Sequence, residues 1–111
     1  MSVLRQIEEL LDAPADGEAA PTLALLEAKL TDGYAQALAL EAERSRIERR
    51  IGEVASTAEE RSDLGLAEEL TSLAGRMRSA DRDLEKLRSV LGRLQARTRA
   101  TRRQTTPDLT A

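Results

Sequence analysis

Residues 66–94 read LAEELTSLAGRMRSADRDLEKLRSVLGRL, and this stretch decides the fold. Apolar residues recur through it at alternating spacings of four and three. The members of this row are Leu66, Leu70, Leu73, Met77, Ala80, Leu84, Leu87, Leu91 and Leu94. A row of this period is typical of helices that pack along their length as a coiled coil. We therefore expect one long helix here, with Thr98 and Thr101 continuing the row weakly.

A second row with the same alternation precedes the first and has two imperfect positions. Its members are Leu23, Leu26, Leu30, Gly33, Ala37, Leu40, Arg44, Ile47, Ile51 and Val54. Pro21 suits the first turn of the corresponding helix, where no N–H is needed. Gly33, next to Asp32, either bends this helix or is tolerated within it. Arg44 either specifies the register of packing or extends its stem past Met77 to solvent.

The two rows are out of phase by one residue between Val54 and Leu66, and we expect a turn within residues 55–65. Ser56 and Thr57 each have a Glu three residues later, which is the pattern of a capping box. An antiparallel arrangement gives facing positions whose numbers sum to 120 or 121, so that Gly33 faces Leu87. The expected fold class is therefore all-α, a long antiparallel coiled-coil helical hairpin. The alternative is one unbroken helix that spans both rows in a parallel dimer.

A short amphipathic helix is expected before the hairpin, at residues 1–12, with Ser2 as its N-cap. Its apolar face carries Val3, Ile7, Leu10 and Leu11. A helix of this length is marginal alone in water, so it must dock on its own chain or bind a partner's groove. Two prolines and a glycine mark residues 13–21 as a linker. The hairpin then covers residues 22–101, and residues 102–111 form a flexible tail.

Charge is distributed unevenly along the chain. Residues 1–84 carry 18 acidic and 10 basic side chains, whereas residues 85–111 carry 2 acidic and 7 basic ones. The candidate anion-binding residues in this basic segment are Arg93, Arg97, Arg99, Arg102 and Arg103. They suit phosphate groups of nucleic acid or an anionic surface. Positive charge near a helix C-terminus is also favourable without any partner.

The composition excludes most site chemistry. The chain has no Cys, His, Trp or Phe, and Tyr34 is its only aromatic residue. Thiol nucleophiles, imidazole acid–base catalysis and the common zinc sites are therefore excluded. The remaining candidates are carboxylates, namely Asp81 with Glu85 and the group Glu59, Glu60 and Asp63. None lies in an apolar row, and we interpret them as solvated surface charge. We expect no catalytic residue, no cofactor and no metal.

These observations predict a non-enzymatic protein that acts through protein–protein contacts as an adaptor, scaffold or small chaperone. The partner is another protein or a second copy, with a homodimer expected. The alternative is a regulatory protein that contacts nucleic acid or another anionic partner through its Arg-rich C-terminal segment. No apolar run is long enough to span a membrane, and no basic start followed by an apolar stretch indicates a secretory signal. A cytoplasmic location is therefore expected.

Overall fold

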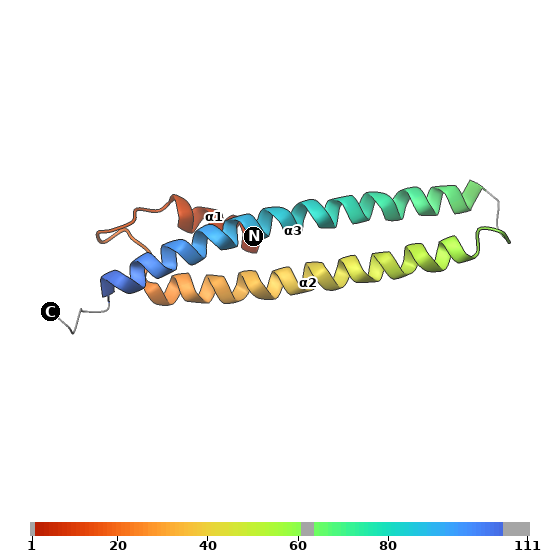
Figure 1. The fold of residues 1–111 in the computed structure, drawn as a ribbon. Helices are drawn as coiled ribbons and strands as arrows, with labels where there is room; N and C mark the ends of the chain where they lie inside the picture. Colours follow the sequence, from red (N-terminus) through yellow and green to blue (C-terminus); the bar gives the residue numbers. More distant parts are fainter. Residues whose placement is uncertain (1, 61–63, 106–111) are drawn as a thin grey trace. The chain divides into compact units, whose positions relative to one another are not determined.

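The computed structural model describes residues 2–60 and 64–105, and every regular element in these ranges is a helix (Figure 1). The helices are α1 (Val3–Asp12), α2 (Leu23–Ser56) and α3 (Leu64–Thr105). The described residues contain no strand, so the all-α prediction is confirmed. Because α2 ends at Ser56, the unbroken helix across both rows is wrong. Residues 57–60 form turns, while 61–63, within the interval expected for the turn, lie outside the described residues.

The helix ends show how local chemistry sets the boundaries. Ser2 caps α1 by accepting a hydrogen bond from the Arg5 N–H at 3.2 Å. The N-terminus of α2 differs from expectation, because the helix begins at Leu23 and Pro21 does not lie in its first turn. The Thr22 hydroxyl accepts from the Leu25 N–H at 3.1 Å, and Pro21 therefore precedes the cap. Helix α2 continues through Gly33 without a break.

The end of α2 and the end of α3 also differ from the sequence-based boundaries. Ser56 and Thr57 do not cap α3, because their hydroxyls donate to the carbonyl oxygens of Glu53 and Val54 at 2.7 and 2.8 Å. They complete the last turn of α2 instead. Helix α3 continues to Thr105, four residues beyond the expected boundary, and residues 106–111 of the expected tail lie outside the described residues.

The chain divides into two compact units. Unit 1 comprises Met1–Ala37 and Lys86–Ala111, and unit 2 comprises Leu38–Glu85. Unit 1 thus holds α1 with the first part of α2 and the second part of α3, whereas unit 2 holds the remaining parts of α2 and α3. Each unit has its own buried apolar residues.

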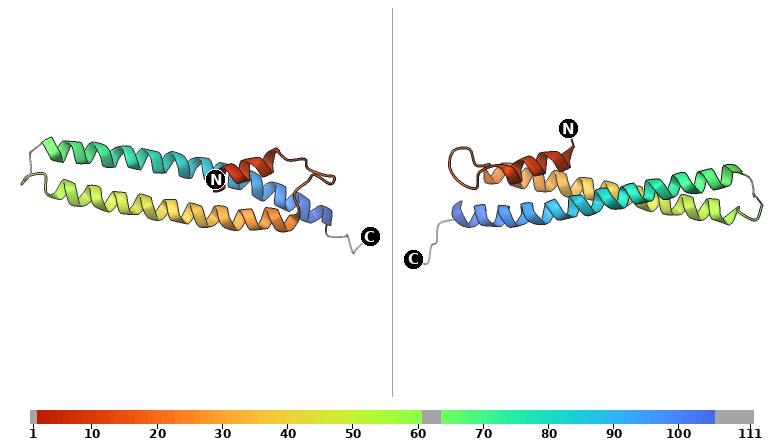
Figure 2. Two further views of the ribbon diagram at one scale, coloured as in Figure 1. Left: turned by 180° about the vertical axis from the view of Figure 1, so that it is seen from behind. Right: turned by 90° about the horizontal axis from the view of Figure 1, so that it is seen from above.

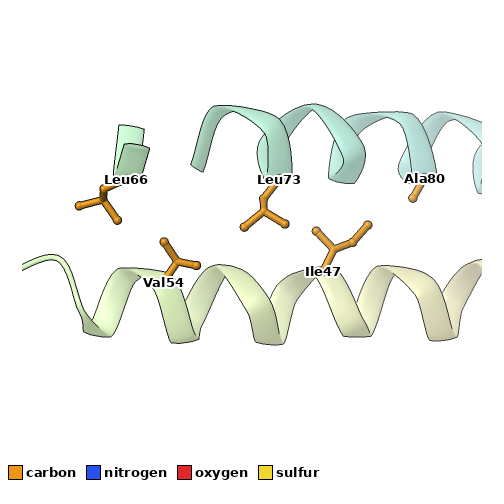
Figure 3. Packing of buried hydrophobic residues seen from close by; sticks show 5 residues of the cluster. All are labelled: Ile47, Val54, Leu66, Leu73 and Ala80. Carbon is orange, nitrogen blue, oxygen red and sulfur yellow. The ribbon is translucent and has the colours of Figure 1, made fainter. Parts of the chain in front are cut away.

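The core of unit 2 is a single row of side chains between two helical segments. Its buried members are Ile47, Val54, Leu66, Leu73 and Ala80, with Ile51, Leu70 and Met77 partly buried against them. Figure 3 shows Val54 pointing between Leu66 and Leu73, and Ile47 pointing between Leu73 and Ala80. The buried side chains of the two segments therefore alternate along this row.

The core of unit 1 lies among three helical segments (Figure 2). Its buried apolar members are Ile7, Leu26, Leu87, Val90, Leu91 and Leu94, and Thr98 is buried with them. Val90 lies outside the apolar row that the sequence predicted, yet it is only 8% exposed. Thr98 continues the row as expected, and its hydroxyl donates to the Leu94 carbonyl at 2.7 Å. The buried stripe of α3 is therefore wider here than in unit 2.

Candidate functional site

Helix α1 carries the predicted partner-binding residues, and it packs on its own chain within unit 1. Ile7 is fully buried, at 0% exposure, while Val3, Leu10 and Leu11 are partly buried. Arginine and lysine side chains from the other two segments contact α1 as well. The Nζ of Lys29 lies 2.9 Å from Oε1 of Gln6. Docking on the same chain, one of the two expected roles of α1, is thus the arrangement that the structure contains.

Gly33 forms a notch in α2 that receives side chains from both neighbouring segments. A Cβ built on Gly33 would lie 3.0 Å from Cδ1 of Ile7 and would collide with Cδ2 of Leu91. Gly33 is therefore required by close packing and not by a bend in the helix. The α3 side chain nearest to Gly33 is Leu91, one helical turn beyond the Leu87 that the expected pairing placed there. We expected a large side chain to lie against the small Gly33, and Leu91 is that side chain.

Arg97 stabilises the C-terminal end of α1. Its Nη1 donates to the carbonyl oxygens of Leu10 and Leu11 at 2.7 and 3.1 Å, and its Nη2 donates to the carbonyl oxygen of Pro14. The last carbonyls of a helix have no partner within the helix. A guanidinium supplies several N–H donors in a fixed plane, and its positive charge is favourable at this end of the helix dipole. Arg97 thus connects residues that are 87 positions apart in the sequence.

The sequence contained a signal for this contact that the sequence analysis missed. The last turn of α1 has no basic residue of its own, and Ala13 and Pro14 follow it in place of a glycine. A helix end without these features needs donors from elsewhere. The sequence pattern instead placed Arg97 among the candidate anion-binding residues.

The other arginines of that set have different surroundings. Arg102 pairs with Glu27 of α2, with Nη2 2.9 Å from Oε1. Arg93, Arg99 and Arg103 are exposed. Arg99 and Arg102 also line a shallow pocket of about 200 Å³ with Leu30, Tyr34, Gln95 and Thr98, and the Gln95 amide donates to the Tyr34 hydroxyl. The structure therefore does not gather the five arginines into one free anion site, because two of them serve contacts within unit 1.

Charged side chains in unit 2 pair between its two segments. Arg50 reaches Glu69 at 2.7 Å, and Arg76 reaches Glu43 at 2.9 Å. Hydrogen bonds from Arg46 and then from Arg76 hold the pKa of the Glu43 carboxyl below its usual range. Hydrogen bonds to Glu69 and then to Glu53 raise the pKa of the Arg50 guanidinium. Glu43 of α2 pairs with Arg76, whereas Arg50, further along α2, pairs with Glu69, which lies earlier in α3. The two segments therefore run antiparallel within the unit.

Arg44 and the candidate carboxylates also lie in unit 2. Arg44 is about half exposed, and its Nε lies 2.8 Å from Oδ1 of Asp81, with Glu48 as a second, longer contact at 3.8 Å. The Arg44 side chain therefore does not interrupt the core. Asp81 is a surface partner of an arginine. Glu59 and Glu60 are exposed, and Asp63 lies outside the described residues. Residues 2–60 and 64–105 contain no group of three or more acidic side chains placed to hold a metal ion.

Two further findings complete this description. Among the described residues, no helix combines the length and apolar character that crossing a membrane requires. Comparison with protein-family models, with curated proteins and with solved structures finds no match to this chain.

Proposed function

We propose that the chain is a non-enzymatic coiled-coil helical hairpin, preceded by a short amphipathic helix, that acts through protein–protein contacts. In this proposal it serves as an adaptor, scaffold or small chaperone, and one of its partners is a second copy. The proposal concerns the packing surfaces of the helices and assigns no catalytic residue and no cofactor.

The open flanks of the core in unit 2 carry the proposal. Ile51, Leu70 and Met77 pack against the buried row but remain partly exposed, because only two helical segments surround it. Leu38 and Leu64 of the same unit are 66% and 75% exposed. Burying an apolar side chain fully is worth about 1.5–3 kcal/mol relative to leaving it in water. A further helix packed on these flanks gains this free energy, and four helices in a dimer of hairpins provide it.

Sedimentation of the full chain over a wide concentration range tests this proposal. We expect the mass to rise above the 12.1 kDa of one chain as concentration increases. Met77→Gln keeps the length of the side chain but makes its end polar, so it weakens association while circular dichroism of the dilute protein stays unchanged. Arg78→Gln, at the exposed neighbouring position, is the matched control and leaves association unaltered.

The opposite result is equally clear. A mass of one chain at every concentration, together with cooperative melting and no crosslinked partner in native lysate, contradicts a role in protein–protein contact. We do not propose anion binding through the arginine-rich segment, because Arg97 and Arg102 are engaged with α1 and Glu27. The salt dependence of any association separates the two functions, since phosphate binding weakens steeply with salt and apolar packing does not.

A further inference from the structure

We propose that the groove of unit 1 that receives α1 is an exchangeable docking site, and that its second occupant is α1 of another copy of this chain. This inference rests on the proposed function in protein–protein contact and names the surface and the partner. The groove lies between α2 and α3, and three features of it, the Gly33 notch, Lys29 and Arg97, contact α1.

Each of these features recognises a different part of α1. The notch at Gly33 accepts the branched side chain of Ile7, which is fully buried. Lys29 bonds to the side chain of Gln6 one residue earlier. Arg97 bonds to the main-chain carbonyls at the end of the helix. A ligand for this groove is therefore a short helix with a branched apolar residue near its middle and a free C-terminal end.

The connection between α1 and α2 does not bind α1 tightly to its own groove. Residues 13–22 contain no helix of their own, and 14–19 are exposed throughout. Gly17 has a φ of 86°, which permits a reversal of the chain there. Leaving the groove breaks the packing of Ile7, the bond from Lys29 to Gln6 and the bonds from Arg97, and an equivalent groove restores each of them. A ten-residue helix is marginal in water, and after leaving it regains its structure in the next equivalent groove.

A second copy is the partner that satisfies every requirement of this groove. It carries the same α1, whose fit the structure displays residue by residue, and it offers the same notch and the same arginine in return. Reciprocal exchange preserves all the contacts of the closed chain, which makes it a low-cost route to a dimer. The fraction of exchanged dimer therefore increases with protein concentration, whereas docking of α1 within one chain does not depend on concentration.

Crosslinking between two differently tagged full-length copies tests the exchange. The chain has no cysteine, so one copy carries Gln6→Cys and the other carries Lys29→Cys as unique thiols. A short bismaleimide joins the two copies when α1 of the first lies against α2 of the second. We expect a mixed product whose yield rises with concentration. The control pairs Gln6→Cys with a thiol at the exposed Glu53 of unit 2, and it gives little mixed product.

Ile7→Asp provides a reciprocal check, because its effect depends on which copy carries it. In the Gln6→Cys copy the substitution prevents α1 from entering any groove, so the mixed product is lost. In the Lys29→Cys copy it releases that copy's own α1 and opens the groove, so the yield rises severalfold. A variant that merely unfolds the chain lowers the yield in both placements, and this result overturns the proposal.

Two other results also overturn it. One is a mixed yield equal to that of the Glu53 control, which indicates random collision. The other result comes from a chain that carries both Gln6→Cys and Lys29→Cys. If this chain forms crosslinks only within itself at every concentration, α1 does not exchange between copies. Sedimentation distinguishes this failure from that of the proposed function, since association without exchange retains protein–protein contact through other surfaces.

Discussion

Units 1 and 2 share the same two long helices but differ in how many helical segments surround the core. In unit 2, the buried residues of α3 are Leu66, Leu73, Ala80 and Leu84, and the first three are seven residues apart. In unit 1, which holds α1 as a third helical segment, the buried stripe of α3 includes Val90 beside Leu91. A narrow stripe is typical of two packed helices and a wider one of a helix with several neighbours. The width of the stripe therefore reports the number of packing partners.

The two units also use arginine differently. In unit 2, Arg50 and Arg76 pair with exposed carboxylates of the opposite segment. Exposed pairs of this kind contribute about 0–1 kcal/mol each. In unit 1, Arg97 bonds to the main-chain carbonyls of Leu10 and Leu11, of which Leu10 also accepts from the Ala13 N–H at 3.3 Å. Loss of this charged donor costs more than loss of an exposed ion pair, because it removes hydrogen bonds from part-buried main-chain groups.

The largest expected effect comes from placing a charge in either core. Leu84 of unit 2 and Leu87 of unit 1 are each 2% exposed, and Glu85 between them is exposed. A buried carboxylate without a partner costs roughly 3–5 kcal/mol. Leu84→Asp and Leu87→Asp therefore lower the melting temperature and helical content measured by circular dichroism, whereas Glu85→Ala changes stability by less than about 0.5 kcal/mol. Equal melting of all three variants contradicts the assignment of the cores.

Removing Arg97 sharpens the comparison, because its effect is confined to unit 1. Arg97→Ala removes a charged donor from the carbonyls of Leu10, Leu11 and Pro14, and we expect a loss of about 2 kcal/mol. Hydrogen exchange then increases in α1 and leaves the amides around Ile47 unchanged. Arg93→Ala, at an exposed position of the same helix, serves as the control. If exchange rises equally in the two units, Arg97 does not act through α1.

Two glycines of α2 give opposite predictions in the two units. Gly33→Ala gains helix propensity of about 1 kcal/mol but crowds Leu91 and Ile7, which costs about 1–3 kcal/mol, so we expect net destabilisation. Gly52→Ala in unit 2 meets nothing within 4 Å and stabilises by about 0.5–1 kcal/mol. Urea unfolding measures both changes. The notch is disproved as a packing feature if the two variants shift stability in the same direction.

The smallest expected effect is the response of unit 2 to acid. The pKa of Glu43 is lower in the folded chain than its ordinary value of 4.5, because Arg46 and Arg76 bond to the carboxylate. Its contribution is present above pH 4.5 and is lost as the pH falls through the lowered folded value. The melting temperature of the natural chain therefore falls more steeply in acid than that of Glu43→Gln. Parallel curves for the two proteins show that the ion pairs contribute nothing measurable.

Much of the helical arrangement was predictable because it depends on local spacing. The rows at Leu66–Leu94 and Leu23–Val54 repeat often enough to define two long helices and the phase slip between them. Ser2 was likewise predictable as a cap from its own chemistry. The facing register was not, because a shift of one turn keeps every apolar residue on the same side of its helix. Only the structure distinguishes Leu91 from Leu87 as the neighbour of Gly33.

The site-related features were less accessible to sequence reasoning. Val90 lies outside the apolar row, and the spacing of that row does not encode its burial in unit 1. Arg97 carries the same charge as its neighbours, and only its distance to the end of α1 separates it from the exposed Arg93 and Arg99. A pattern in one helix cannot specify which distant main-chain groups require a donor.

The long sequence separation between Arg97 and α1 has a consequence for how the protein is made. In unit 2, the paired residues Arg50 and Glu69 are 19 positions apart, so this unit forms soon after its segments leave the ribosome. Unit 1 forms later, because Arg97 is synthesised 87 residues after Leu10. During that interval Ile7 has only the α2 side of its site, at Gly33, because Leu91 has not yet been made. A copy that has left the ribosome already carries a complete groove, so α1 of a chain still being made meets that groove before its own is finished.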